Sequence, residues 1–385
     1  MTGKPEPHFC DWNAGAPVDP RVLECFVRVE RDCPGNPASV HSAGRRARAE
    51  LEGARARIAS ALGVAPDDLV FTSGGTEAAN LAVHGLGDAG LPVLLAPTEH
   101  PATFEAAHRR GMVSWEVDTE GRAIVREPEQ PVGLVALVHA QSELGTLQPV
   151  EGAAALATSM RVPLFVDAAQ SLGRIELRTV LDQATAVALS PHKCGGLRGH
   201  GVLVVRDAAL SLRPMLNGGG QEQGLRPGTQ SPALAAANAL AIELAIVELA
   251  RRQACMRRAR DSFLAGLVSS AVDHRVLTPL DSSLPNTAMI AFAEVEGRNL
   301  LPMLDLVGIQ ASHGSACSSG APLPPRVLRR IGLDDAVART CVRFSFGWIE
   351  SQQDRFEVGR RTGDVIAAQR KKSSAHDGRA TNCHR

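Results

Sequence analysis

One lysine of this 385-residue chain stands where its amine is able to do covalent chemistry. An arginine guanidinium stays protonated and forms no Schiff base, whereas a desolvated lysine amine does. Lys193 closes the segment Ser190-Pro-His-Lys193, which follows an apolar run and precedes two glycines; elsewhere lysine occurs only at positions 4, 371 and 372. The sequence therefore predicts that Lys193 attaches a carbonyl compound. A mobile glycine-rich loop, whose lysine survived by chance, is the alternative.

A second segment is suited to binding an anion. Phe71-Thr-Ser-Gly-Gly-Thr-Glu77 follows an apolar run and leads into a helical pattern. Gly74, Gly75 and Thr76 would offer backbone N–H groups and a hydroxyl at the N-terminus of that helix, an arrangement that favours a phosphate. An ordinary helix cap after a tight turn is the alternative. Two further donors to the same phosphate precede the lysine, namely Ser190 and His192.

Polar residues that suit an aromatic heterocycle follow two other apolar runs. Asp167 ends Leu164-Phe-Val-Asp167, and a buried carboxylate is costly unless it pairs with a protonated ring nitrogen or an arginine. Gln170 lies just beyond it. His100, in Thr98-Glu-His100, would stack on a ring and move protons, although a lone histidine more often has a structural role. An amine, a phosphate cradle, a carboxylate and a stacking group together meet the needs of pyridoxal 5'-phosphate (PLP).

Taken in chain order, these motifs resemble those of the cysteine desulfurases, the NifS/IscS-like branch of the class V aminotransferases, which have the type I fold of PLP enzymes. The resemblance runs from Asp11-Trp-Asn-Ala-Gly15 to Arg343-Phe-Ser-Phe-Gly347. Further matches lie between these ends: Gly35-Asn-Pro-Ala-Ser39, Gly218-Gly-Gly-Gln-Glu222, Arg226-Pro-Gly-Thr229 and Gly314-Ser-Ala-Cys317.

The resemblance implies a reaction and a role for each matched residue. The chain would remove sulfur from L-cysteine, release L-alanine and leave a persulfide on Cys317, the nucleophile, for a sulfur-acceptor protein. Lys193 would hold PLP as a Schiff base, Asp167 would pair with its pyridine nitrogen, and His100 would stack on its ring and act in catalysis. The other implied contacts are Gln170 at the phenolic oxygen; Gly74, Gly75, Thr76, Ser142, Ser190 and His192 around the cofactor; Thr229 from the second subunit of a homodimer; and Asn13 and Arg343 at the substrate carboxylate.

Two positions decide how far the resemblance reaches. Cys317 lies in the small, polar segment Ser312-His-Gly-Ser-Ala-Cys-Ser-Ser-Gly-Ala-Pro322, which predicts an accessible loop similar to the family's longer-loop group. Ser142 stands where the family usually has an asparagine that helps to hold cofactor and substrate. A selenocysteine lyase, another class V reaction and a catalytically weak scaffold that binds a sulfur carrier stay open as alternatives. The sulfur acceptor also stays open among iron–sulfur cluster assembly, tRNA thiolation, DNA phosphorothioation and other pathways.

Alternating secondary structure is expected to position these residues. From about residue 68 to 206, short apolar runs alternate with helical patterns, which predicts an α/β fold with a mostly parallel seven-stranded sheet and active-site residues at its carboxyl edge. We expect a large PLP-binding domain over 14–250. A smaller α+β domain, formed by 1–13 and 251–370, would carry the cysteine loop, and 371–385 would be a disordered tail. The runs predicted as strands are 69–72, 93–96, 113–117, 132–138, 162–166, 186–189 and 201–205.

Composition argues against several other classes of protein. Lys plus Arg and Asp plus Glu both total 41, so the formal net charge is zero, and neither a nucleic-acid-binding nor a membrane-binding surface is expected. The 8 cysteines form no Cys-x-x-Cys pair, which leaves metal ligation without support and is typical of reduced thiols in the cytoplasm. The polar N-terminus contains two prolines, so no signal peptide is expected.

Overall fold

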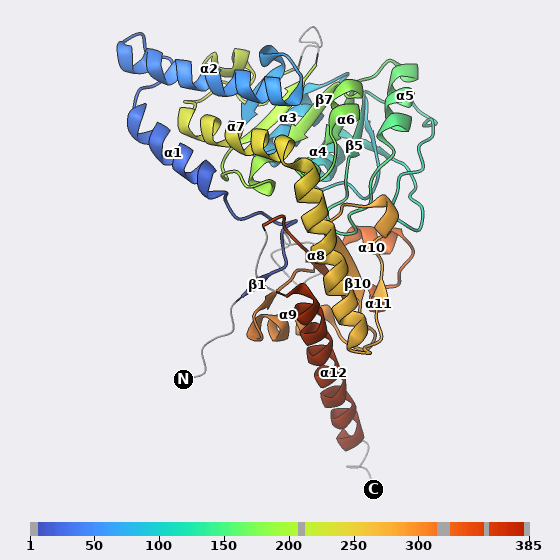
Figure 1. Ribbon diagram of the computed structural model, residues 1–385. Coiled ribbons are helices and arrows are strands. Elements are labelled where there is room, and N and C mark those ends of the chain that lie inside the picture. Colours follow the sequence, from blue (N-terminus) through green and yellow to red (C-terminus); the bar gives the residue numbers. More distant parts are fainter. Residues whose placement is uncertain (1–6, 207–211, 314–323, 350–353, 381–385) are drawn as a thin grey trace.

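A seven-stranded sheet forms the centre of the larger part of the molecule (Figure 1). The computed structural model describes residues 7–206, 212–313, 324–349 and 354–380. The strand order is β2-β8-β7-β6-β5-β3-β4. Strand β8 runs antiparallel to both of its neighbours, and the other pairs are parallel. The predicted α/β fold with a mostly parallel sheet is therefore confirmed.

The strands are short apolar runs, and except in the edge strand β4 all of their residues are buried. Burial on both faces is typical of parallel sheets that helices cover on each side. The strands are β2 (Leu69–Thr72), β3 (Val93–Leu95), β4 (Met112–Ser114), β5 (Leu134–Val138), β6 (Leu164–Asp167), β7 (Ala186–Leu189) and β8 (Gly201–Val205).

Helices cover the two faces of this sheet. Side chains alternate along each strand, so Val70 packs toward one layer while Leu69 and Phe71 pack toward the other. The first layer consists of α3 (Gly75–Gly85) and α4 (Pro101–Arg110). The second layer consists of α1 (Pro20–Asp32), α2 (Ser42–Leu62), α5 (Val150–Met160), α6 (Arg178–Gln183) and α7 (Pro232–Val247).

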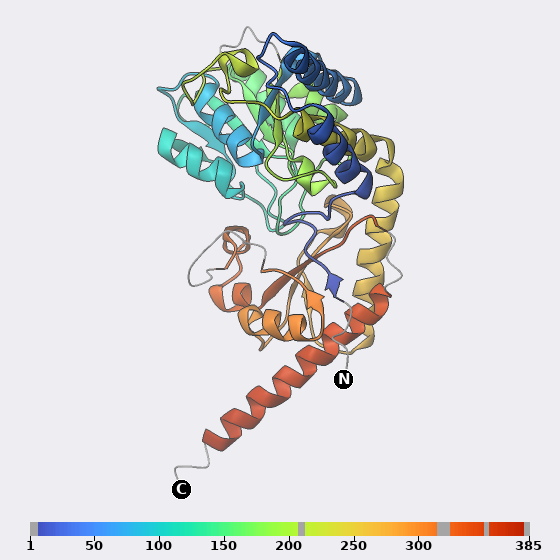
Figure 2. The same ribbon diagram turned by 90° about the vertical axis from the view of Figure 1, so that its left-hand side faces the viewer.

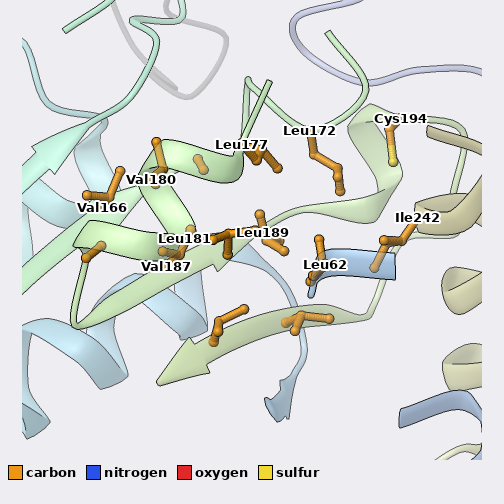
Figure 3. Close-up of a cluster of buried hydrophobic side chains, with 14 of the residues drawn as sticks. Leu62, Val166, Leu172, Leu177, Val180, Leu181, Val187, Leu189, Cys194 and Ile242 are labelled. Carbon is orange, nitrogen blue, oxygen red and sulfur yellow. The ribbon is translucent and has the colours of Figure 1, made fainter. Parts of the chain in front are cut away.

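The buried cluster between the sheet and the second layer reaches the lysine segment. Figure 3 shows Val187 and Leu189 of β7 in this cluster, with Ile242 of α7 nearby. Cys194, the residue directly after Lys193, is fully buried in the same cluster. The core therefore holds the backbone on which Lys193 sits.

The carboxyl ends of four neighbouring parallel strands, β3, β5, β6 and β7, meet at one edge of the sheet. Asp167, the last residue of β6, lies opposite Val138 of β5 and Ala188 of β7. The polar segments that follow these strands are consequently brought together, as is usual for sites in open α/β sheets.

The smaller part of the molecule contains a three-stranded antiparallel sheet, β12-β10-β9, and a parallel pair, β1-β11. Its N-terminal strand ties residues near the start of the chain to this part. Helices α7 and α8 meet at Glu248 with a bend of 75°, close to the predicted domain boundary. The elements are β1 (His8–Phe9), α8 (Leu249–Ser269), β9 (Arg275–Val276), β10 (Thr287–Ala291), α9 (Gly297–Leu306), β11 (Ile309–Gln310), α10 (Arg326–Arg330), α11 (Asp335–Arg339), β12 (Cys341–Ser345) and α12 (Arg355–Ala380).

The final helix reaches into the segment expected as a tail. Helix α12 packs beside α8 and then extends away from the rest of the chain (Figure 2). It continues to Ala380, whereas the sequence predicts a disordered tail from residue 371. A helix that has formed on a packed surface adds further residues at little cost, and the tail contains good helix formers such as Lys371 and Ala380. Residues 381–385 lie outside the described part.

None of the described helices is by itself long and apolar enough to cross a membrane. The bent pair α7 and α8 passes such a test together, on length and composition alone.

Two ion pairs fasten the loop after β8 to the segment around β2. The buried Glu222 carboxylate accepts hydrogen bonds from Arg55 Nη2 at 2.7 Å and from the Phe71 backbone N–H at 2.8 Å. Glu222 has a φ of 49°, which is rare for a residue with a side chain, so its contacts hold a strained backbone. A second pair joins Arg226 Nε to Glu77 Oε1 at 2.9 Å. Both pairs brace the turn that contains the expected phosphate cradle.

We expect Glu222→Gln to lower the free energy of unfolding by about 3 kcal/mol, because the buried Arg55 guanidinium would lose its main charged partner. Urea unfolding followed by circular dichroism measures the change. The matched control is Asp182→Asn in the exposed pair with Arg178, which should cost less than about 1 kcal/mol. Equal losses in the two variants would contradict the importance assigned to the buried pair.

Candidate active site

A cavity of about 210 Å³ lies at the edge where the four parallel strands end. It brings together side chains that are far apart in the sequence. Of the residues expected in the site, those lining it are Gly75, Thr76, His100, Ser142, Asp167, Gln170, Ser190, His192 and Lys193. The rest of the lining is Ala14, Thr98, Val138, Ala140 and Ala169.

Lys193 ends a short 3-10 turn, Pro191–Lys193, directly after β7. Burial lowers the pKa of its amine from 10.5 to about 8; the negative charge of Asp167 opposes this shift, and the positive charge of Arg174 adds to it. The neutral amine is the form that attacks a carbonyl carbon. A far larger fraction of the Lys193 amine is therefore neutral and reactive near neutral pH than for an exposed lysine.

Asp167 lies at the end of β6 with its side chain almost fully buried. One oxygen, Oδ1, accepts a hydrogen bond from the Ala169 backbone N–H at 2.9 Å. No salt bridge to Asp167 forms within the described ranges, so the arginine pairing weighed as an alternative is not observed there. The carboxylate faces the cavity and is available to a cationic N–H group.

Ser190 and the start of α3 form a compact cradle. Gly74 is the N-cap of α3, and Gly75 is its first residue. A Cβ atom on Gly75 would lie 2.3 Å from Ser190 Oγ, so only glycine allows this approach. Burial lowers the pKa of His192 to about 4, which leaves a neutral imidazole beside the same cradle. Backbone N–H groups at a helix N-terminus and a neighbouring hydroxyl suit a phosphate.

His100 has a defined orientation because it caps α4. Its Nδ1 accepts a hydrogen bond from the Ala102 backbone N–H at 3.1 Å, which places the ring proton on Nε2. Burial lowers the pKa of His100, so the neutral imidazole is favoured at neutral pH. The ring lines the cavity and is able to stack on a flat ligand.

Asn13 and Arg343 do not line the cavity. Both donate to the Ser142 backbone carbonyl, from Asn13 Nδ2 at 3.0 Å and Arg343 Nη1 at 3.1 Å. Arg343 also pairs with Asp11 at 2.7 Å. The Ser142 hydroxyl itself donates to Glu143 Oε2 at 2.8 Å. The two residues expected at the substrate carboxylate thus support the cavity wall from behind.

Two further residues were expected at the site. Thr229 is exposed and does not line the cavity. Cys317 belongs to 314–323, which lies outside the described residues.

Several residues near the site carried no assigned role in the sequence analysis. Thr98 lines the cavity, and its buried hydroxyl has no hydrogen-bond partner among the described residues. Burial raises the pKa of Glu99 to about 8, while the Val138 backbone N–H donates to one of its oxygens. Arg174 contacts the Gln170 side chain. In the sequence, only the Thr98-Glu-His100 motif pointed to Thr98 and Glu99, and no motif pointed to Arg174.

The donor set fits PLP. Lys193 offers an amine, Asp167 a carboxylate, and Ser190 with the start of α3 an anion cradle. Buried hydroxyls are normally hydrogen-bonded, so the unpartnered Thr98 Oγ1 suggests that a polar ligand atom belongs in the cavity.

Comparisons with known proteins point in the same direction. A family model described as aminotransferase class-V matches residues 8–355. The cysteine desulfurase IscS of Dictyoglomus turgidum is 32% identical over 359 residues, which cover 90% of this chain and 91% of that protein. A NifS-like protein structure superposes with a TM-score of 0.84 at 29% identity and covers 94% of this chain and 99% of its own. A structure of SspA in complex with cysteine superposes with a TM-score of 0.75 at 27% identity and covers 89% of this chain and 99% of its own.

In the apoprotein, we expect reductive methylation of the Lys193 amine to follow a titration with its midpoint near pH 8, because burial lowers that pKa. Only the neutral amine reacts, so the rate should fall as the pH drops below the midpoint. Mass spectrometry of the peptide that contains Lys193 gives the rate. Asp167→Asn should lower the midpoint further, because it removes the charge that favours the protonated amine. A wild-type midpoint above about pH 10, the value of an exposed lysine, would contradict the prediction.

Proposed function

Because this chain belongs to the class-V aminotransferase family, we propose that it is a PLP-dependent cysteine desulfurase. It would take sulfur from L-cysteine, release L-alanine and carry a persulfide on Cys317. The observation that carries the proposal is the meeting of Lys193, Asp167 and His100 at one cavity, in a chain related to cysteine desulfurases over most of its length. The structural likeness to SspA in complex with cysteine supports the choice of substrate.

Each residue at the cavity has a task in this reaction. Bound PLP supplies an electron sink for negative charge at the substrate's α carbon. Asp167 holds a proton at the ring nitrogen, and Ser190 with the N-terminus of α3 anchors the phosphate. Lys193, with its lowered pKa, takes the proton from the α carbon. His100 would stack on the ring, with its own proton on Nε2.

Sulfur transfer requires Cys317. Its thiolate, the nucleophilic form, attacks the sulfur of L-cysteine. A sulfur–sulfur bond forms as the carbon–sulfur bond breaks, the bonding electrons stay with the β carbon, and that carbon takes up a proton. The Lys193 ammonium returns a proton to the α carbon, so L-alanine leaves. The persulfide then passes to a sulfur-acceptor protein, with iron–sulfur cluster assembly as one destination among those weighed from the sequence.

The described residues on each side of 314–323 support this role for Cys317. On one side, Ser312 forms backbone hydrogen bonds with Arg343 at 3.1 and 2.7 Å. On the other side, the Arg326 guanidinium lies 3.4 Å from the centroid of the Phe104 ring in α4. His100 caps that same helix. The described residues that flank 314–323 are thus held against β12 on one side and against α4 on the other.

We also propose that the protein works as a cytoplasmic homodimer. Thr229 is exposed, in a loop that the pair of Arg226 and Glu77 holds beside α3, which leaves its hydroxyl accessible to a second subunit. The sedimentation mass of the purified protein checks the dimer.

We expect Cys317→Ser to bind L-cysteine but to release no sulfide. Binding should appear as a change in the absorbance of bound PLP at about 420 nm, a band typical of this cofactor on a lysine. Sulfide and alanine are measured in the presence of dithiothreitol. The control Cys33→Ser changes a free and partly exposed cysteine that does not line the cavity and should keep the wild-type rate.

Sulfide release by Cys317→Ser at the wild-type rate would overturn the assignment of the nucleophile. Pyruvate as the product of the wild-type protein would favour transamination, and a faster reaction with selenocysteine would favour a selenocysteine lyase. A protein that binds no PLP would favour the scaffold alternative.

The substitution Ser142→Asn should tighten binding of L-cysteine about fivefold, because a new amide donor at the cavity wall is worth about 1 kcal/mol. Ser142→Ala should change it little, since the wild-type hydroxyl donates to Glu143 rather than into the cavity. The KM for L-cysteine of the two variants provides the comparison. A strong loss in Ser142→Ala would show that the hydroxyl itself serves the substrate.

A further inference from the structure

Arg174 is a fully buried arginine directly behind the cavity. Its guanidinium donates to the backbone carbonyls of Trp12 at 2.8 Å, Gln170 at 3.2 Å and Lys193 at 3.4 Å. It also donates to the Gln170 side-chain oxygen Oε1. One guanidinium therefore joins the N-terminal segment, the turn after β6 and the lysine turn after β7.

This arginine is costly to bury. Burial lowers its pKa to about 9, and the positive charge of Arg343 lowers it further. No carboxylate pairs with it within the described ranges. Burying a cation without a carboxylate partner is unfavourable, so we infer that Arg174 has a role beyond packing.

The contact with Gln170 decides what that side chain offers the cavity. A glutamine amide has one oxygen acceptor and two N–H donors. Arg174 occupies the oxygen, and Nε2 donates one hydrogen to the Asn13 backbone carbonyl at 3.0 Å. One N–H is left for a ligand, since Gln170 lines the cavity. If the amide turned over, its N–H groups would face the N–H groups of Arg174, and its oxygen would face the Asn13 carbonyl oxygen.

The charge of Arg174 also acts on Lys193. The charged groups that face the lysine amine are Asp167 and Glu143, which favour its protonated form, and Arg174 and Arg343, which disfavour it. The imidazoles of His100 and His192 face it as well, and burial keeps both neutral.

We propose that Arg174 is a positioning residue for the cofactor, which fixes Gln170 as a hydrogen-bond donor into the cavity and sets a positive charge behind Lys193. The inference rests on the proposed PLP site and goes beyond it, because neither the family motifs nor the cavity lining includes Arg174. It predicts two separable effects, one that depends on the planar shape of the guanidinium and one that depends on its charge.

The experiment compares Arg174→Lys and Arg174→Gln with the wild-type holoenzyme. Arg174→Gln removes a positive charge that disfavours protonation near Lys193. The pH midpoint of the band at about 420 nm should therefore rise by about one unit, which is the size expected for a nearby charge at an effective dielectric constant of about 20. Arg174→Lys keeps the charge and should keep the midpoint. It cannot hold both Gln170 Oε1 and the Trp12 carbonyl, so the dissociation constant of PLP should rise about tenfold, equal to the loss of one strong hydrogen bond.

A double-mutant cycle with Gln170→Ala tests whether Arg174 acts through Gln170. The loss of PLP affinity in Arg174→Lys should largely vanish when Gln170 is already alanine. Additive losses would overturn the positioning role, and an unchanged midpoint in PLP-loaded Arg174→Gln would overturn the electrostatic one. If Arg174→Gln does not fold, the cycle with Arg174→Lys still decides.

The proposed function is judged separately, from the wild-type protein alone. Its band at about 420 nm and its formation of alanine test PLP binding and desulfuration. The role of Arg174 is judged only from differences between variants. A wild-type protein that binds PLP but forms no alanine would therefore reject the desulfurase while leaving the Arg174 comparison intact.

Discussion

The burial of ionisable groups at one edge of the parallel sheet is the constraint on which the site depends. Removal from water disfavours the charged form of any side chain. It brings the pKa of Lys193 down to about 8 and that of His192 to about 4, and it raises that of Glu99 to about 8. Reactivity at Lys193 is thus a property of its place. The same amine on the surface would be protonated and inert near neutral pH.

That edge works only because the backbone behind it is held in place. Cys194 is locked into the core between the sheet and α7, and the buried Arg252 guanidinium donates to its carbonyl at 2.9 Å. Arg252 in turn lies 4.3 Å from the centroid of the Trp348 ring. Arg174 holds the carbonyl of the lysine itself. Two buried arginines and a hydrophobic cluster therefore fix the turn, which limits the positions that the Lys193 amine is able to reach.

The wall of the cavity at Ser142 depends on contact between the two parts of the molecule. Asn13 and Arg343 reach from the N-terminal segment and β12 to the Ser142 carbonyl. Arg343 is engaged by Asp11, so binding a substrate carboxylate there would require it to exchange that partner. These hydrogen bonds join the two parts of the molecule at Ser142, the residue that departs from the family pattern.

The sequence by itself determined where the central strands lie and which motif residues follow them. An apolar run such as 186–189 consists of consecutive residues, so it can be recognised without the fold. Lys193, Asp167 and His100 stood out in their motifs, and the structure brings all three to one cavity. The sequence had no means to find Arg174, whose partners lie up to 162 positions away. It also gave no sign that α12 continues through 371–380, since the stability of a helix end comes from the surface on which the helix starts. Contacts between distant residues depend on strand order and register, and only the tertiary structure decided these.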